Sequence, residues 1–290
     1  MKPVALITSK KWGNAIRGDL ALQSALKKIG VPSEIICWNE STDWTKYSLI
    51  ILRSCWDYYD DYQAFLNWLS KLSRRNIPVA NGVCRIRNNI DKEVQTKILE
   101  SCSIKPLPHF ICDTQDSVRE ALRSCSWQQF IMKPSVSSGG HNTFLLDRTT
   151  KNWLTLVENV ANLIFQDEYK VILQPFVSSV KDGEVSLIFF EGKYSHSVIR
   201  YPGVLGKKCP PHAALNLDLH WMEAGHQVCR FLQGEQLLYM RIDLVEYMGQ
   251  IWIMEVELAE PDLYFHLGAD EQAAPVDTFA QKIRGRVLQD

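Results

Sequence analysis

The sequence predicts a mixed fold, in which an α/β segment with a parallel sheet precedes α+β segments with antiparallel sheets. In the first quarter of the chain, short apolar strands alternate with helical stretches, which is typical of βαβ units. After Glu184 the apolar strands come in pairs around short glycine-containing turns, which is typical of β-hairpins. Apolar residues are 46% and charged residues 22% of the 290, so the composition is that of an ordinary globular chain.

The α/β segment alternates strands and helices from the start of the chain. Glycine at position 30 follows the first helix, where only Gly adopts the left-handed conformation at little cost. No Gly-x-Gly-x-x-Gly follows the first strand, so a dinucleotide site there is not supported. The predicted elements are strand Val4–Thr8, helix Arg17–Ile29, strands Ser33–Cys37 and Ser48–Arg53, helix Asp60–Ser73 and strand Pro78–Ala80.

The middle of the chain predicts a second group of strands, preceded by a helix that ends before two prolines, Pro106 and Pro108. A short loop rich in Ser and Gly, Ser135–Gly140, separates two of these strands. The predicted elements are helix Asp91–Cys102, strand Phe110–Cys112, helix Ser117–Ser124, strands Gln129–Lys133 and Asn142–Leu146, helix Asn152–Phe165 and strand Val171–Gln174.

The last third predicts two hairpins, one turning at Glu191-Gly192 and one around Gly249. Between them, Pro202–Pro211 is expected to be a mobile loop because it is rich in Gly and Pro. The predicted elements are strands Glu184–Phe190 and Lys193–Tyr201, helix Leu217–Leu232, strands Tyr239–Glu246 and Ile251–Leu258, and helical stretches near Pro261–Leu267 and Glu271–Val287.

Charge and cysteine usage exclude several classes of partner. Lys and Arg (32) nearly balance Asp and Glu (33), so we expect no nucleic-acid partner and no binding to an anionic membrane. The first apolar run is too short for a signal peptide, and no run is long enough to span a bilayer. The eight cysteines form no Cys-x-x-Cys pair, which favours reduced thiols in the cytoplasm.

The second hairpin carries three carboxylates and an arginine on alternating strand positions. With a two-residue loop, Asp243 would oppose Met254; with a three-residue loop, Asp243 opposes Glu255, and Arg241 opposes Glu257. We expect the second register, with Met254, Val256 and Leu258 on the other face. Carboxylates this close repel one another unless a cation neutralises them, and an all-oxygen site suits Mg²⁺. The alternative is a solvated strand face.

Two lysines occupy positions that suit an anion. Lys133 ends an apolar strand just before the Ser135–Gly140 loop, and such loops can direct successive N–H groups at phosphate oxygens. Lys92 follows Asp91 at a predicted helix start, with Asn89 as the expected N-cap, although the helix dipole disfavours a cation there. The alternative for Lys133 is an exposed lysine beside a flexible turn.

In chain order, Asp91-Lys92, Met132-Lys133-Pro134, Gln174-Pro175-Phe176, Gly183-Glu184, Arg241-Ile242-Asp243 and Glu255-Val256-Glu257 resemble the ATP-grasp superfamily. This is the fold of D-alanine–D-alanine ligase and glutathione synthetase. Three further stretches resemble the small branch that contains the cyclo-ligase of D-cycloserine biosynthesis; they are Arg53–Tyr58, Phe189–Ser197 and Glu255–Pro261.

The resemblance implies an ATP-grasp fold preceded by a Rossmann-like (pre-ATP-grasp) domain. It places the first domain at residues 1–82 and the ATP-grasp domain at 83–290. Within the second domain, the small lobe would run over about 107–177 and the large lobe over about 178–290.

The resemblance also implies a role for each matching position. Lys92 and Lys133 would hold the phosphates of ATP, under a closing loop that includes Ser138 and Gly139. Gln174, Phe176 and Val177 would line the adenine, and Glu184 would bind the ribose. Asp243, Glu255 and Glu257 would ligate two Mg²⁺ ions. Arg241, Arg200 and Lys133 would act on the transferring phosphate. Two positions depart from the commoner pattern, since family ligases have Asn at the position of Glu257 and Lys at that of Arg200.

The activity implied is an ADP-forming ligase that joins a carboxylate to an amine through an acyl phosphate, on an amino-acid-like small molecule. The two groups could belong to one molecule, as in a cyclo-ligase, or to two. The alternatives are an ATP-grasp kinase and a non-catalytic nucleotide-binding module, and a homodimer stays open. Substrate contacts are expected at Arg53, Trp56, Asp57 and Tyr58, which follow a strand end, and at His196, unless it is structural.

Overall fold

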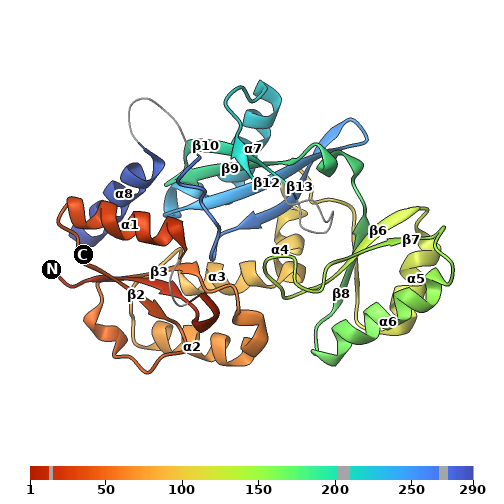
Figure 1. Ribbon diagram of the computed structural model, residues 1–290, viewed down its shortest axis with the longest axis horizontal. Helices are drawn as coiled ribbons and strands as arrows, with labels where there is room; N and C mark the ends of the chain where they lie inside the picture. The colour runs from red at the N-terminus through yellow and green to blue at the C-terminus, as the bar shows by residue number, and fades with distance from the viewer. Residues whose placement is uncertain (13–15, 202–209, 268–273, 290) are drawn as a thin grey trace.

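The computed structural model describes residues 1–12, 16–201, 210–267 and 274–289, and among them three sheets form (Figure 1). The predicted mixed architecture is confirmed, with one parallel sheet followed by two antiparallel ones. Figure 1 shows the parallel sheet and the small antiparallel sheet at opposite ends of the long axis, and the chain termini beside each other.

The parallel sheet has the strand order β2-β1-β3-β4. Alternate residues of β1 point to opposite faces of the sheet. Val4 and Leu6 pack with α1 and α8, whereas Ala5 and Ile7 pack with α2. The elements are β1 Val4–Thr8, α1 Arg17–Lys28, β2 Ser33–Cys37, β3 Leu49–Ser54, α2 Tyr62–Arg74, β4 Val79–Ala80 and, from the far end of the chain, α8 Pro275–Gln289.

The second sheet is antiparallel, with the order β5-β8-β6-β7, and its two helices share one core with it. A capping box between Thr114 and Ser117 starts the first of these helices. The elements are β5 Phe110–Cys112, α5 Gln115–Ser124, β6 Gln129–Pro134, β7 Phe144–Asp147, α6 Trp153–Gln166 and β8 Val171–Pro175.

The third sheet has the order β11-β10-β9-β12-β13, and α7 packs on one of its faces. On the opposite face, Ile188 and Phe190 of β9 join the core with α8, while Ser186 and Asp243 are buried polar residues. The elements are β9 Glu184–Phe190, β10 Lys193–Arg200, β11 His212–Ala213, α7 Leu219–Phe231, β12 Met240–Tyr247 and β13 Gln250–Glu257.

Two helices, rather than the single helix predicted over Asp91–Cys102, join the first sheet to the second. They are α3 Val83–Ile90 and α4 Lys92–Leu99. Asp91 caps α4, because its Oδ1 accepts hydrogen bonds from the amides of Glu93 (2.9 Å) and Val94 (3.4 Å). The prediction of Asn89 as the cap is wrong: it lies in α3 and binds the backbone of the segment Val256–Leu258.

The segment after β13 also differs from the prediction. Pro261–Leu267 contains no helix, and forms an irregular connection ending in a turn. The predicted mobile loop lies outside the described residues except for Pro210 and Pro211, and α8 is described from Pro275. Short 3₁₀ helices lie at Lys10–Trp12, Trp44–Lys46, Tyr58–Asp61, Ser178–Lys181 and Gly234–Gln236. Within the described part of the chain, no helix has both the length and the apolar character needed to cross a membrane.

Candidate active site

A cavity of about 410 Å³ lies where the second and third sheets face each other, and the strand-end segment Trp56–Tyr58 closes part of its wall. Its lining combines lysines, carboxylates and an apolar strip. The described lining residues are Trp56, Tyr58, Asn89, Ile90, Lys92, Gln95, Ile131, Lys133, Ser137, Ser138, Gly139, Gly140, Thr143, Gln174, Pro175, Phe176, Val177, Val180, Glu184, Arg200, Tyr201, Arg241, Met254, Glu255, Val256, Glu257, Glu260, Asp262 and Tyr264.

The β12–β13 hairpin has the predicted pairing at its acidic end but reaches it in another way. Asp243 pairs with Glu255 and Arg241 with Glu257, as expected. The loop has two residues, not three: Met248 (φ 53°) and Gly249 (φ 73°) lie between the paired ends, and both have the positive φ of a type I′ turn. The register instead shifts by one residue between Asp243 and Leu244.

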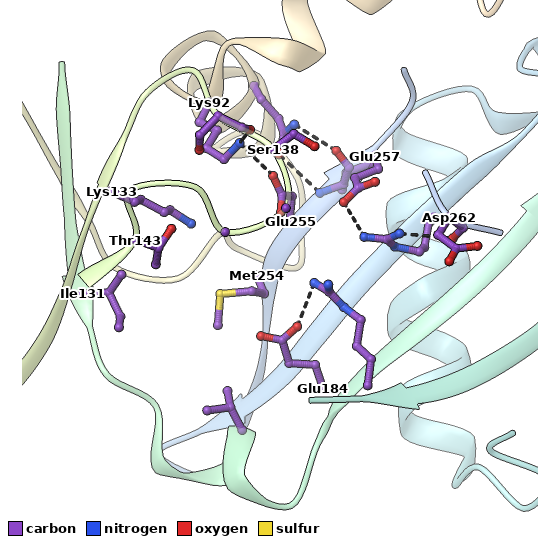
Figure 2. A pocket seen from close by; sticks show the side chains of 18 of the residues that line it. Lys92, Ile131, Lys133, Ser138, Thr143, Glu184, Met254, Glu255, Glu257 and Asp262 are labelled. Atoms are coloured by element: carbon purple, nitrogen blue, oxygen red, sulfur yellow. Dashed lines mark hydrogen bonds and ion pairs between the residues drawn. The ribbon is translucent and has the colours of Figure 1, made fainter. Parts of the chain in front are cut away.

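This shift is a β-bulge that leaves Met254 without a partner on β12. Consequently Met254 lines the cavity together with Glu255, while Ile253 and Val256 stay buried in the core (Figure 2). The expectation that Met254 faces away with Val256 is therefore wrong. The Met254 sulfur accepts a hydrogen bond from Nε2 of Gln174 (3.5 Å), which joins the hairpin to β8.

The three carboxylates of the hairpin form one cluster. Ligand oxygens of Asp243, Glu255 and Glu257 all lie within 4.8 Å of one another. Asp243 is fully buried and receives hydrogen bonds from Ser186 Oγ (2.5 Å) and Arg241 Nε (3.0 Å). The side chains of Glu255 and Glu257 remain 23% and 25% exposed to the cavity, so their oxygens are the accessible ones.

Two arginines neutralise the buried part of this cluster. Arg241 pairs with Asp243 and Glu257, and its Nη1 donates to the carbonyl of Asp262 (3.1 Å). Arg200 Nη2 lies 2.7 Å from Asp243 Oδ2 and 2.8 Å from Glu184 Oε2, so it joins β10 to the adjacent strand β9 and to β12 beyond it (Figure 2 shows the Glu184 pair). All three carboxylates offer oxygen ligands, and this donor set fits Mg²⁺.

Burial and neighbouring charges shift the pKa values of the two accessible glutamates, Glu255 and Glu257, in opposite directions. Burial raises the pKa of Glu255, but Lys92 and Lys133 overcome this effect and lower it below its usual range. At Glu257, burial outweighs the attraction of Arg241, and its pKa is raised. Burial, followed by the charge of Glu257, also raises the pKa of Glu260 to about 8.

The two predicted phosphate lysines reach the cavity from different elements. Lys133 extends from β6 into the cavity (Figure 2), and no described residue forms a hydrogen bond or ion pair with its ammonium. Burial lowers its pKa. Lys92, at the start of α4, lies 3.2 Å from Glu255 and donates to the carbonyl of Ser137 (2.7 Å). The site therefore holds positive charge opposite the carboxylates.

The Ser135–Gly140 loop is held against the N-terminal segment. The carbonyl of Ser137 also accepts from the Tyr58 hydroxyl (3.2 Å), and the His141 ring stacks on Tyr59 at 4.4 Å. Ser138 and Gly139 line the cavity, as predicted.

An apolar strip continues the cavity away from the carboxylates, and the predicted adenine residues are part of it. Gln174, Phe176 and Val177 line it, joined by Ile131 and Met254. The amide of Phe176 donates to the carbonyl of Gln129 (3.0 Å), so this amide is not available to a base edge.

Three residues expected to contact substrate are buried in the protein and do not line the cavity. Arg53 is fully buried, pairs with Asp19 (3.1 Å) and donates to the carbonyl of Pro261 (3.3 Å). Asp57 accepts from the indole of Trp38 (3.0 Å). These contacts make both residues structural, whereas Trp56 and Tyr58 do line the cavity.

His196 is the third residue that the prediction misplaced. It lies inside the core, where its ring nitrogens contact Ser195 Oγ (3.0 Å) and the carbonyl of Leu263 (2.9 Å). Burial lowers its pKa to about 4, so the imidazole is neutral. The structural alternative for His196 therefore holds.

Three lining residues, Glu260, Asp262 and Tyr264, were not predicted as site residues. They follow the end of β13, and Pro261–Leu267 was expected to be helical. Met254 was missed because a bulge decides its direction.

Comparison with known proteins gives two family matches. Residues 4–81 match the N-terminal domain of the D-cycloserine synthetase DcsG, and residues 99–247 match the ATP-grasp domain of prokaryotic glutathione synthetase. The cycloserine biosynthesis protein DcsG of Streptomyces lavendulae is 23% identical over 91% of this chain and 93% of its own length.

Solved structures share the fold. The crystal structure of D-cycloserine synthetase DcsG covers 98% of this chain and 99% of its own, with 23% identity and a TM-score of 0.83. A RimK domain ATP-grasp protein from Sphaerobacter thermophilus covers 97% of this chain and 98% of its own, with 12% identity and a TM-score of 0.73. D-alanine–D-alanine ligase from Bacillus anthracis in complex with ATP covers 100% of this chain and 98% of its own, with 14% identity and a TM-score of 0.71.

Proposed function

Because the chain belongs to the family of the prokaryotic glutathione synthetase ATP-grasp domain, we propose that it is an ATP-dependent carboxylate–amine ligase releasing ADP and phosphate. The observation that carries this proposal is the charge arrangement of the cavity. The ammonium of Lys133, which has no partner among the described residues, lies in the same cavity as the accessible carboxylates of Glu255 and Glu257. A nucleoside triphosphate with its divalent cation would satisfy both groups, because the phosphates would pair with the ammonium and the cation with the carboxylates.

In this proposal the nucleotide lies along the cavity. The base occupies the apolar strip of Ile131, Phe176 and Met254, and the ribose lies near Glu184. The phosphates then reach Lys133 and Lys92, under the backbone of Ser138 and Gly139. Lys92 would exchange its ion pair with Glu255 for the phosphates when the nucleotide binds.

The carboxylate cluster would hold magnesium, with Glu255 and Glu257 as the accessible ligands and Asp243 behind them. Magnesium there would neutralise charge on the phosphates as the γ-phosphoryl group is transferred. The proposed number of ions is two. One Mg²⁺ would balance the two accessible carboxylates, Glu255 and Glu257, and the nucleotide phosphates would balance the second.

The reaction would proceed in two steps. A substrate carboxylate attacks the γ-phosphorus and ADP leaves, giving an acyl phosphate; an amine then attacks the carbonyl carbon and phosphate leaves. Arg241 and Arg200, which line the cavity, would stabilise negative charge on the phosphoryl and carbonyl oxygens. The loop at Ser138 would exclude water, which otherwise hydrolyses the acyl phosphate.

The proposed substrate is a small amino-acid-like molecule. DcsG and D-alanine–D-alanine ligase, which share the fold, are named for amino-acid-derived products and substrates.

The experiment measures ADP release with ATP, Mg²⁺ and a panel of amino acids, with hydroxylamine as the amine. Hydroxylamine attacks an acyl phosphate to give a hydroxamate, which ferric iron reveals by its colour. We expect hydroxamate and ADP in equal amounts with at least one carboxylate. A stable phosphorylated product without hydroxamate would instead establish the kinase, and nucleotide binding without any ADP release would establish the non-catalytic module.

Glu255→Gln tests the metal ligand in the same assay. The amide cannot supply the negative charge that Mg²⁺ requires, so ADP release should fall by about 100-fold or more. Glu120→Gln, on the exposed side of α5, is the matched control and should keep full activity. Full turnover of Glu255→Gln would contradict the assignment.

A further inference from the structure

The Glu260 side chain has no role in the site as described so far, yet it lines the cavity. It is 7% exposed, and no described residue donates a hydrogen bond to its carboxylate or pairs with it. Its main chain is held firmly: the indole of Trp56 donates to the carbonyl of Glu260 (2.8 Å), and Arg53 donates to that of Pro261 (3.3 Å). The carboxylate is thus fixed in position but unpartnered.

A buried carboxylate without a partner is costly, and its surroundings make it more so. The nearest charges include Glu257 and Glu255, which repel it. The cations that reach it are already engaged: Lys92 with Glu255 and the carbonyl of Ser137, and Arg241 with Asp243 and Glu257. Within the described protein nothing balances a negative charge on Glu260, which is why the pKa of this carboxyl is raised, and a bound cation would stabilise its charged form.

The chemistry around Glu260 favours an organic cation over a metal ion beyond those proposed for the carboxylate cluster. The oxygens that could share a metal belong to Asp243, Glu255 and Glu257, and Glu260 is outside this group. Trp56, which is half-buried and lines the same cavity, has an aromatic ring of the kind that attracts an ammonium group. An ammonium also supplies three donors to a carboxylate that has none.

We propose that the Glu260 carboxylate binds the α-ammonium group of an amino-acid substrate, the same molecule whose carboxylate is phosphorylated. Glu260 lies three positions after Glu257, a separation that spans at most about 10–11 Å of extended chain. An α-amino acid held at Glu260 by its amine therefore presents its carboxylate toward the phosphate end of the cavity. This inference rests on the ligase function proposed above.

The test compares each α-amino acid that the wild-type protein activates with the carboxylic acid that lacks its amino group, such as alanine with propanoate. Hydroxamate formation is measured with ATP, Mg²⁺ and hydroxylamine for wild type, Glu260→Gln and Glu260→Asp. In Glu260→Gln, KM for the amino acid should rise about 10- to 100-fold, while KM for the des-amino acid and for ATP stay within about twofold. Glu260→Asp, which keeps the charge, should retain the preference for the amino acid, and Glu120→Gln should match wild type throughout.

Two results would overturn the inference alone: wild type that activates both acids of a pair equally well, or Glu260→Gln that keeps the wild-type preference. Absence of ADP release with every carboxylate would instead remove the ligase, and this inference with it. Thermal unfolding separates substrate binding from a structural role. Glu260→Gln should unfold at or above the wild-type temperature, because it removes an unpartnered charge; a lower temperature would show that the carboxylate supports the fold.

Discussion

Lys133 and Glu260 bring opposite charges into one cavity, and neither has a partner among the residues that the structure describes. Arg241 and Asp243, in contrast, are fully satisfied by each other and by their neighbours. Because unpaired buried charges destabilise a protein, a site that keeps them is prepared for charged ligands. The unpaired groups are therefore the ones whose replacement should change binding more than stability.

Lys133→Ala is the direct test of this distinction. Loss of a charge-assisted contact should weaken ATP binding by about 10- to 100-fold, while the thermal unfolding temperature stays close to that of wild type because no protein contact is lost. Isothermal calorimetry with ATP and Mg²⁺ measures the affinity. Lys151→Ala, in an exposed turn before α6, is the control. Unchanged affinity for ATP would refute the phosphate role of Lys133.

At the scale of elements, the β12–β13 hairpin determines where the site's side chains point. Its bulge lets Met254 and Glu255 share one face, so that one strand supplies both an apolar contact and a metal ligand at successive residues. Beyond the bulge, alternation resumes with Val256 in the core and Glu257 at the cavity. Removing the bulged residue should then leave the pairing of Asp243 with Glu255 unchanged.

Deletion of Met254 tests this conclusion. The regular hairpin that results keeps Ile253 in the core and Glu255 at the cavity, so the protein should fold and retain Mg²⁺-dependent ADP release. Affinity for ATP should fall by about 10-fold, since the deletion removes a half-buried apolar side chain whose burial by the base would be worth roughly 1.5 kcal/mol. Met254→Leu, which restores the apolar contact, is the control. A complete loss of Mg²⁺ dependence in the deletion variant would show that the register had shifted.

The hairpin also shows which features of the site could be predicted from the sequence and which could not. Alternation of charged and apolar residues left two registers open, and the correct pairing was chosen from a three-residue loop that the structure does not have. The bulge that produces this pairing was not predicted, because a register shift depends on packing across three strands. Arg53 was misjudged for a related reason: its partner Asp19 lies 34 residues earlier in the chain, and strand-end position alone does not reveal burial. Lys133 was found because it interrupts an apolar strand beside a small-residue loop.

At the scale of the whole molecule, all three sheets contribute to one cavity. The second sheet supplies Lys133, the third supplies Glu255, and the segment after β3 supplies Trp56 and Tyr58. The loop at Ser137 bridges these parts through Tyr58, and His141 of the same region stacks on Tyr59. The position of this loop therefore depends on the first sheet as well as on its own.

Tyr59→Ala should release the loop from the N-terminal part of the protein. An aromatic stack is worth about 0.5–1.5 kcal/mol, so the detached state should be populated about 2- to 10-fold more. Limited proteolysis within Ser135–Gly140 should accelerate by that factor, and ADP release without an amine should rise as water enters. Tyr59→Phe keeps the ring and should behave as wild type. Equal cleavage rates in all three proteins would show that the stack does not hold the loop.

The placement of α8 has a consequence for synthesis on the ribosome. Phe279, Ala280 and Ile283 of this helix complete the core beneath Val4 and Leu6, and Figure 1 shows α8 beside α1. Helix α1 covers part of that face early, but the part that α8 covers stays exposed until more than 270 later residues have been translated. The amino-terminal strands should therefore reach their native protection against hydrogen exchange only after translation of Ile283, in the last helix described.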